Sequence, residues 1–276
     1  MTAKKSLTLL ETEALAPVEV GAQMLIEERR QHILLLAQQH GRVLVEDLSQ
    51  ALGISRITIR KDLDYLQGRG VLQRTHGGAL LPQSRTLFDP SLKEKEKRYA
   101  PEKQRIAAAA VGLVQEGQCI LLDSGTTTTA VARALKKFSH LTVITNGVNI
   151  AAELSGTDFE VILTGGSLRK NSFSLVGPLA EDVLHDMHAD ILFLGVDGFD
   201  LEAGLTTPNL MESRVNRAMV KAATTVVAVC DFSKFNRRSL SKIVDVSYVH
   251  HVITDTNLPT TTADAIRSLN IQLTLA

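Results

Sequence analysis

Apolar residues recur at helical spacing in three segments near the start of the chain. These segments predict helices over Glu28–Gln39, Val45–Leu52 and Ser55–Leu66. In the last segment Ile59, Leu63 and Leu66 share one face, which predicts a buried stripe. Gly53 separates the second and third segments, and two helices joined by a short glycine turn are typical of a helix-turn-helix.

An alternating pattern follows these helices. The segment Gly70–Leu80 alternates and contains Gly77 and Gly78, where glycine can supply the positive φ angles of a tight turn. This pattern predicts a small β-hairpin wing beside the helix-turn-helix.

Farther along, the pattern changes to short, continuous apolar runs. Seven runs predict strands, namely Cys119–Asp123, Leu141–Asn146, Phe159–Leu163, Ile191–Asp197, Val226–Asp231, Val249–Asp255 and Ile271–Leu275. Helices are predicted over Pro101–Leu113, Thr129–Lys137, Val148–Leu154 and Glu212–Ala223. Continuous apolar strands that alternate with helices predict a parallel sheet covered on both faces.

These patterns divide the chain into two domains and a connection. We expect a flexible extension over residues 1–24, a DNA-binding domain over 25–82, a linker over 83–100 and an α/β domain over 101–276. The linker contains the charged run Lys93–Arg98, for which solvated, partly helical surface is the favoured interpretation and a signalling hinge the alternative.

The third predicted helix carries candidate chemistry on its outer face. Ser55 is a suitable N-cap, and Arg56 and Arg60 lie four residues apart. The start of such a helix enters the DNA major groove, where arginine can pair with guanine, whereas solvated arginines are the simpler interpretation. The candidate DNA contacts are Ser55, Arg56, Ile57, Thr58, Arg60, Lys61 and, in the wing, Arg74 and His76.

The turn Asp123–Thr128 joins a predicted strand to a helix. Its hydroxyl groups and successive N–H groups suit an anion such as phosphate, and we favour this over simple helix capping. It is not a Walker A loop, because no Gly-Lys-Ser/Thr follows.

Other polar turns also follow apolar strands, where ligands bind in open parallel sheets. Asp123, Asp197, Asp231 and Glu212 can bind sugar hydroxyls, and Lys234 can neutralise a phosphate. The candidate ligand contacts are Asp123, Ser124, Gly125, Thr126, Thr127, Thr128, Asn146, Gly165, Gly166, Asp197, Gly198, Glu212, Asp231 and Lys234.

Composition narrows the class of protein. The 276 residues are 44% apolar, which excludes disorder as the default, and the formal net charge is zero, which excludes a polycation. Two cysteines in apolar runs indicate buried thiols, with no disulfide framework, metal site or cofactor. We see no signal peptide or membrane span, so we expect a cytoplasmic protein that contacts no membrane.

Several pieces of the first half carry a family resemblance. They are Glu28–Ile33, Gly41–Val43, Leu52–Ser55, Thr58–Leu63 and Arg74–Ala79. They resemble the DNA-binding domain of the DeoR family of bacterial transcriptional repressors, which implies a winged helix-turn-helix here.

The second half resembles the sensor domain of the same family. The matching pieces are Leu122–Thr128, Thr142–Asn146, Thr164–Gly166, Phe193–Gly198, Gly204–Thr207 and Asp231–Phe235. The resemblance implies a fold similar to ribose-5-phosphate isomerase and a phosphorylated sugar or sugar alcohol as ligand. The run Phe232–Leu240 is most similar to members that control galactitol or N-acetylgalactosamine use, although Phe232 stands where a small residue is expected.

Two functions compete at this stage. The first is a repressor of a carbohydrate catabolic operon that a phosphorylated sugar releases from its operator DNA. The second is a sugar-phosphate isomerase or hydrolase in which Asp123, Asp197 and Glu212 act as acid and base. The first explains both halves of the chain and makes the protein a non-enzyme without catalytic residues. An activator is possible as well, and operator recognition implies a homo-oligomer, either a dimer or a tetramer.

Overall fold

The computed structural model describes residues 24–69, 71–80, 86 and 89–276. The expected N-terminal extension therefore lies, apart from Met24, outside the described residues. By its contacts, the described chain divides into an N-terminal unit that ends with the strand Gly78–Leu80 and a C-terminal unit that contains everything from Asp89 onward.

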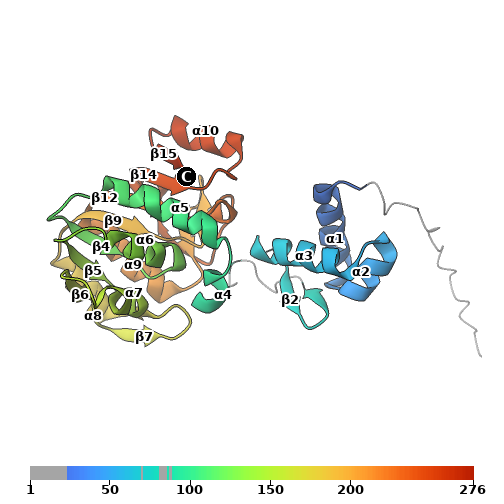
Figure 1. Cartoon of the computed structure of the whole chain (residues 1–276), viewed down its shortest axis with the longest axis horizontal. Helices are drawn as coiled ribbons and strands as arrows, with labels where there is room; N and C mark the ends of the chain where they lie inside the picture. Colours follow the sequence, from blue (N-terminus) through green and yellow to red (C-terminus); the bar gives the residue numbers. More distant parts are fainter. Residues whose placement is uncertain (1–23, 70, 81–85, 87–88) are drawn as a thin grey trace, which may run out of the picture. The chain divides into compact units, whose positions relative to one another are not determined.

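The N-terminal unit contains three helices and three short strands (Figure 1). They are α1 (Ile26–His40), β1 (Arg42–Leu44), α2 (Val45–Leu52), α3 (Arg56–Gly68), β2 (Gln73–Thr75) and β3 (Gly78–Leu80). The predicted helix-turn-helix and wing are confirmed. The sequence pattern did not reveal β1, which pairs with β3 and completes the small sheet β1-β3-β2.

The C-terminal unit is built on the predicted parallel sheet. Its order is β15-β14-β12-β9-β4-β5-β6, with every pairing parallel. The strands are β4 (Cys119–Leu122), β5 (Thr142–Thr145), β6 (Glu160–Leu163), β9 (Ala189–Leu194), β12 (Ala223–Val229), β14 (His251–Thr254) and β15 (Gln272–Leu275). All seven predicted strands are therefore confirmed.

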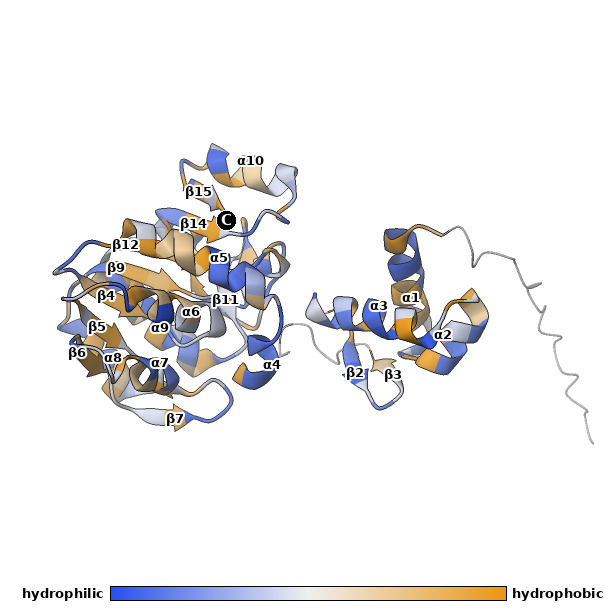
Figure 2. Cartoon of the chain, in the orientation of Figure 1, coloured by the Kyte–Doolittle hydropathy of each residue, from blue (hydrophilic) through white to orange (hydrophobic). Residues whose placement is uncertain are grey.

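Helices cover both faces of this sheet, and the side chains of each strand alternate between them. On β4, Ile120 and Leu122 pack in one hydrophobic cluster with α5, α6 and α7, while Leu121 packs in the other cluster with α8, α9 and α10. The helices are α5 (Ala100–Ala110), α6 (Thr126–Leu135), α7 (Val148–Leu154), α8 (Pro178–His185), α9 (Leu210–Ala222) and α10 (Thr260–Ser268). Figure 2 shows the corresponding hydrophobic colour along the strands.

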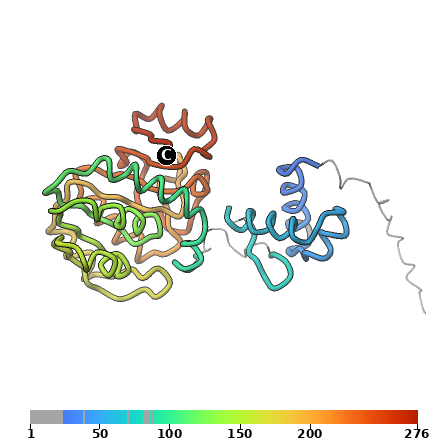
Figure 3. The backbone as a smooth tube through the Cα atoms, viewed as in Figure 1, coloured from blue at the N-terminus to red at the C-terminus, as the bar shows by residue number. Residues whose placement is uncertain are grey.

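Two small antiparallel sheets and a short helix complete the unit. The sheets are β7 (Ser167–Arg169) with β8 (Ser174–Val176), and β10 (Gly198–Asp200) with β11 (Gly204–Thr207) and β13 (Ser241–Val244). The helix α4 (Leu92–Glu96) overlaps the charged run of the expected linker and is followed closely by α5 (Figure 3).

The strand order contains one reversal that matters for function. The chain enters the sheet at β4, adds β5 and β6 on one side, and then places β9, β12, β14 and β15 on the other side. The crevice at the carboxyl ends of β4 and β9 is the topological switch point, where open α/β sheets bind ligands.

Candidate functional site

The outer face of α3 is exposed and carries positive charge. Ile59, Leu63 and Leu66 are buried, as predicted, whereas Arg60 and Lys61 are exposed. Positive charge therefore lies on the side of the helix opposite its packed face.

The start of α3 is held by local hydrogen bonds. The Ser55 hydroxyl accepts a hydrogen bond from the backbone N–H of Thr58 at 3.2 Å, which confirms the predicted N-cap, and the two hydroxyl groups lie 2.9 Å apart. Arg56 forms an exposed ion pair with Glu46 of α2. The contact of Arg56 with DNA stays a prediction.

The two wing candidates differ in their surroundings. The Arg74 guanidinium donates to a carboxylate oxygen of Asp64 at 3.0 Å and to the backbone oxygen of Gly78 at 2.7 Å, so it connects the wing to α3. His76 is exposed in the turn between β2 and β3, next to Gly77 with φ +90°. Arg74 therefore stabilises the wing, and its contact with DNA stays a prediction.

A buried ion-pair cluster supports α3 from behind. The Asp62 carboxylate is buried and accepts from Arg29 Nε at 2.5 Å and from Arg30 Nε at 3.0 Å, both on α1. The Arg30 guanidinium also lies 3.6 Å from the centre of the Tyr65 ring. Sequence reasoning missed this cluster.

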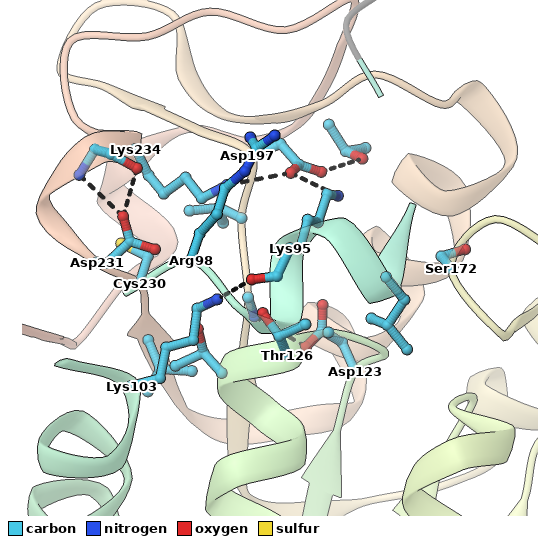
Figure 4. A pocket seen from close by; sticks show the side chains of 18 of the residues that line it. Lys95, Arg98, Lys103, Asp123, Thr126, Ser172, Asp197, Cys230, Asp231 and Lys234 are labelled. Carbon is cyan, nitrogen blue, oxygen red and sulfur yellow. Dashed lines mark hydrogen bonds and ion pairs between the residues drawn. The ribbon is translucent and has the colours of Figure 1, made fainter. Parts of the chain in front are cut away.

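The C-terminal unit carries a polar pocket at the switch point of its sheet (Figure 4). Its free volume is about 80 Å³. The lining residues of this polar pocket that carry the argument below are Lys95, Arg98, Lys103, Asp123, Ser124, Gly125, Thr126, Thr127, Ser172, Asp197, Glu212, Asp231 and Lys234.

The N-terminus of α6 faces the pocket with open backbone donors. Gly125 is the N-cap residue and no side chain of the described structure caps this helix. The hydroxyl groups of Thr128 and Thr129 donate backward to the Gly125 backbone oxygen, at 3.1 Å and 2.5 Å, and so do not cap the first turn. The first N–H groups of a helix have no partner within it, so they can bind an anion.

Asp197 is the most strongly paired carboxylate of the pocket. Its Oδ1 lies 2.9 Å from Lys95 Nζ and 3.5 Å from Lys234 Nζ. Burial by itself raises the pKa of Asp197, but the two ammonium groups outweigh it and hold the pKa well below its usual value. Burial likewise lowers the pKa of Lys95, yet Asp197 and the farther Asp89 and Glu212 leave it above its usual value.

Two other carboxylates lie deeper in the same pocket. The Asp123 carboxylate accepts from the Gly195 N–H at 2.9 Å, and burial, together with nearby Glu212 and Asp197, raises its pKa well above the usual value. Glu212 on α9 accepts from Arg169 at 3.0 Å and from the Ser174 hydroxyl at 2.9 Å. Asp123 is thus suited to donate a hydrogen bond and Glu212 to accept one.

The expected linker contributes Lys95 to the pocket, and the helix that follows contributes Lys103. Lys95 comes from α4, and Lys103 on α5 donates to the Lys95 backbone oxygen. Lys103 is buried, and burial lowers its pKa to about 8, although nearby Asp231 opposes the change. The charged run therefore contributes part of the candidate site, and the interpretation as solvated surface is wrong for Lys95.

The same segment is tied to the rim of the pocket. Arg169 on β7 forms an ion pair with Asp89, while Asn171 donates from its side chain to the Asp89 backbone oxygen at 2.9 Å. The Leu92 N–H donates to the Asn171 backbone oxygen at 2.9 Å. These contacts hold the start of α4 against the β7–β8 hairpin.

The structure brings nine of the fourteen predicted ligand contacts together. They are Asp123, Ser124, Gly125, Thr126, Thr127, Asp197, Glu212, Asp231 and Lys234. The other five, Thr128, Asn146, Gly165, Gly166 and Gly198, are not among the lining residues. Asn146, for example, is buried and donates to the Leu175 backbone oxygen at 3.2 Å, which is a structural role.

Metal and membrane sites receive no support from the described residues. No group of three or more His, Cys, Asp or Glu side chains among them can hold a metal ion. None of the helices in this part of the chain is both long and apolar enough to cross a bilayer. Cys230 is buried and Cys119 half-buried, and both are free thiols.

A helix-turn-helix unit joined to an α/β unit with a polar pocket is the organisation of a transcriptional regulator. The model of the DeoR-like helix-turn-helix domain matches residues 29–85, and that of the DeoR C-terminal sensor domain matches residues 98–256. The chain therefore belongs to the DeoR family of transcriptional repressors.

Similar proteins agree with this assignment. The putative aga operon transcriptional repressor of Escherichia coli O157:H7 is 42% identical over 250 residues, which is 90% of this chain and 93% of that protein. The glycerol-3-phosphate regulon repressor of Escherichia coli K12 is 33% identical, over 90% of this chain and 98% of its own length. Both are named as repressors, so the chain is a regulator and the alternative of an enzyme is not supported.

A distant resemblance links the chain to a solved enzyme structure. Ribose 5-phosphate isomerase A from Methanocaldococcus jannaschii is 18% identical, with a TM-score of 0.37 over 50% of this chain and 55% of that one. A score this low supports no inference from the chemistry of that enzyme.

Proposed function

We propose that the protein binds operator DNA through α3 and is released from it when a phosphorylated sugar or sugar alcohol occupies the polar pocket. The observation that carries this proposal is the composition of the pocket. It combines an open helix N-terminus and three lysines with four acidic side chains. A ligand with one anionic end and several hydroxyl groups matches that combination.

The two ends of such a ligand have different partners. The phosphate fits the start of α6 at Gly125–Thr127, where open N–H groups and hydroxyl groups lie beside Lys103. The hydroxyl groups fit Asp123, Asp197 and Glu212, which lie at the carboxyl ends of β4 and β9 and at the start of α9. This orientation places the phosphate beside a cation and the hydroxyl groups beside carboxylates.

The Lys95–Asp197 ion pair indicates how binding reaches DNA. Lys95 Nζ lies 2.9 Å from Asp197 Oδ1, and both residues line the pocket. A ligand whose hydroxyl groups bind Asp197 therefore has to exchange with the Lys95 side chain. Because α4, which carries Lys95, precedes α5 and follows the DNA-binding unit in the chain, the ligand shifts the equilibrium away from the DNA-binding arrangement.

The proposal is tested by fluorescence anisotropy on labelled DNA from upstream of the chain's own operon. The competitors are phosphorylated galactitol, phosphorylated N-acetylgalactosamine, glycerol 3-phosphate and the unphosphorylated parent of each. Release by one phosphorylated compound and not by its parent supports the proposal. Tight binding that none of these compounds affects would remove the proposed ligand from it.

Replacing Lys95 by methionine tests the coupling between pocket and DNA. We expect the ratio of operator affinities without and with saturating effector to fall about tenfold, because coupling energies of ~1–3 kcal/mol correspond to about 5- to 150-fold effects. Lys93→Met is the matched control, since Lys93 is an exposed lysine of the same helix α4. An unchanged ratio in Lys95→Met would show that α4 does not transmit the signal.

Replacing Arg60 by alanine tests the DNA-reading helix. We expect operator affinity to fall about 5- to 100-fold at fixed salt and the preference for one base pair to relax, since a bidentate arginine contact contributes ~1–3 kcal/mol. Arg267→Ala removes an exposed arginine from α10 of the C-terminal unit and is expected to leave both unchanged. Selective, full-affinity binding by Arg60→Ala would contradict the assignment of α3.

A further inference from the structure

One apolar side chain on α3 is exposed and lies outside the buried face of the helix. Ile57 is 66% exposed, whereas Ile59, Leu63 and Leu66 on the same helix are 5% exposed or less. Ile57 is the second residue of α3, at the end of the helix that enters the groove in helix-turn-helix proteins. Its exposure therefore has no explanation in the core of this unit.

The neighbours of Ile57 are charged. Arg60 and Lys61 follow it by three and four residues, which places them beside it on the helix surface, and both are exposed. Arg56, which precedes it, is exposed as well. The centre of an apolar protein interface is depleted of charged residues, so this surrounding disfavours another protein as the partner of Ile57.

DNA has one apolar group that lies close to its phosphates and could contact an apolar side chain surrounded by cations. The 5-methyl group of thymine is the apolar feature of the base edges in the major groove, and the neighbouring phosphates suit the lysine and arginine side chains. The side chain of isoleucine can contact that methyl group but cannot form a hydrogen bond with any base.

We propose that Ile57 is a specificity-determining residue that contacts the 5-methyl group of one thymine in each operator half-site, beside the base pair contacted by Arg60. The inference rests on the proposed role of α3 in DNA binding. It adds to that role the base that is recognised and the chemical group of the base that Ile57 contacts. A contact with one methyl group changes affinity by about three- to tenfold, since burial of a CH₂-sized group is worth ~0.8 kcal/mol and close packing adds to it.

The test removes single methyl groups from the DNA. The full-length protein is footprinted on its upstream DNA to locate the binding site, and each thymine in the site is then replaced in turn by deoxyuridine, which lacks only the methyl group. Anisotropy titrations at fixed salt compare wild type with Ile57→Ala. We expect wild type to lose about three- to tenfold at one thymine of each half-site. Ile57→Ala is expected to be weakened on unmodified DNA and to show no further loss at that thymine.

Two controls make the result specific. Ile57→Val keeps branched methyl groups and should keep the sensitivity to deoxyuridine, while Leu35→Ala removes a 53% exposed apolar side chain from α1 and should leave the whole profile unchanged. Because Ile57 is exposed, its replacement should not change the melting temperature. The inference is overturned if Ile57→Ala shows the same deoxyuridine profile as wild type, or if no thymine in the site is sensitive. Failure of the proposed function has a different signature, since wild type would then show no selective binding at all.

Discussion

Replacement of Asp62 by alanine is expected to unfold the N-terminal unit while the C-terminal unit stays folded. The Asp62 side chain is 2% exposed, and its partners Arg29 and Arg30 are only 11% and 18% exposed. Removal of the carboxylate leaves Arg29 without this ion-pair partner and leaves Arg30 with the exposed Glu27. Breaking a buried ion pair from one side costs about 3–5 kcal/mol, which is a large part of the stability of a small domain.

Hydrogen exchange on the full-length protein distinguishes the two units. In Asp62→Ala we expect the amides of α1, α2 and α3 to lose protection, while those of β4, β9 and β12 keep it, because these elements belong to separate compact units. Operator binding should be lost together with this protection.

Asp64→Ala provides the matched control. Asp64 also accepts from an arginine, Arg74, but its side chain is 63% exposed. An ion pair this exposed contributes at most about 1 kcal/mol, so the control should keep normal protection in all three helices. Equal loss of protection in both variants would show that burial of the Asp62 cluster is not what matters.

The Asp62 cluster illustrates what the sequence pattern could and could not predict. The three N-terminal helices and seven parallel strands follow from local periodicity, since burial of one helix face or of both strand faces constrains the residues themselves. The pairing of Asp62 with Arg29 and Arg30 depends on how α1 crosses α3, and no local pattern contains that information. For the same reason three-residue strands such as Gly198–Asp200 went unnoticed.

The candidate ligand site was predicted only in part. The sequence did not reveal the order of the strands in the sheet. Asp123, Asp197 and Asp231 follow β4, β9 and β12, which are neighbours at the switch point of the sheet. Asn146 and Gly165 follow β5 and β6, which extend away from that point, and they do not line the pocket. A polar turn after a strand is therefore a useful signal only once the neighbours of the strand are known.

Lys95 and Lys103 were missed for a different reason. A run of alternating charges is normally solvated, and the fold instead turns Lys95 toward Asp197. Lys103 did carry a local signal, because it lies three, four and seven residues before the buried Ile106, Ala107 and Ala110. A lysine on the buried face of a helix lowers the stability of the fold. Its presence there therefore indicates that the charge serves the site.

Replacement of Lys103 by methionine is therefore expected to stabilise the folded protein and to abolish the response to the effector. Burial lowers the pKa of Lys103 from 10.5 to about 8, so its protonated form is disfavoured in the native state by at most ~3 kcal/mol at neutral pH. Methionine fills similar space without a charge but loses the hydrogen bond to the Lys95 backbone oxygen. We expect a net gain of about 1–2 kcal/mol in the free energy of unfolding at pH 7.

The dependence of this gain on pH provides the decisive measurement. Between pH 8 and 10.5 the unfolded wild-type chain holds the Lys103 proton while the folded protein has released it, so wild-type stability rises with pH in this window. Denaturant titrations should therefore show a constant advantage of Lys103→Met below pH 8 that shrinks toward pH 10. Lys221→Met, at an exposed lysine of α9, should show no such dependence. A Lys103→Met variant that is destabilised at pH 7, or whose advantage does not change with pH, would contradict the prediction. It would show that burial in the pocket does not destabilise the protonated form of Lys103.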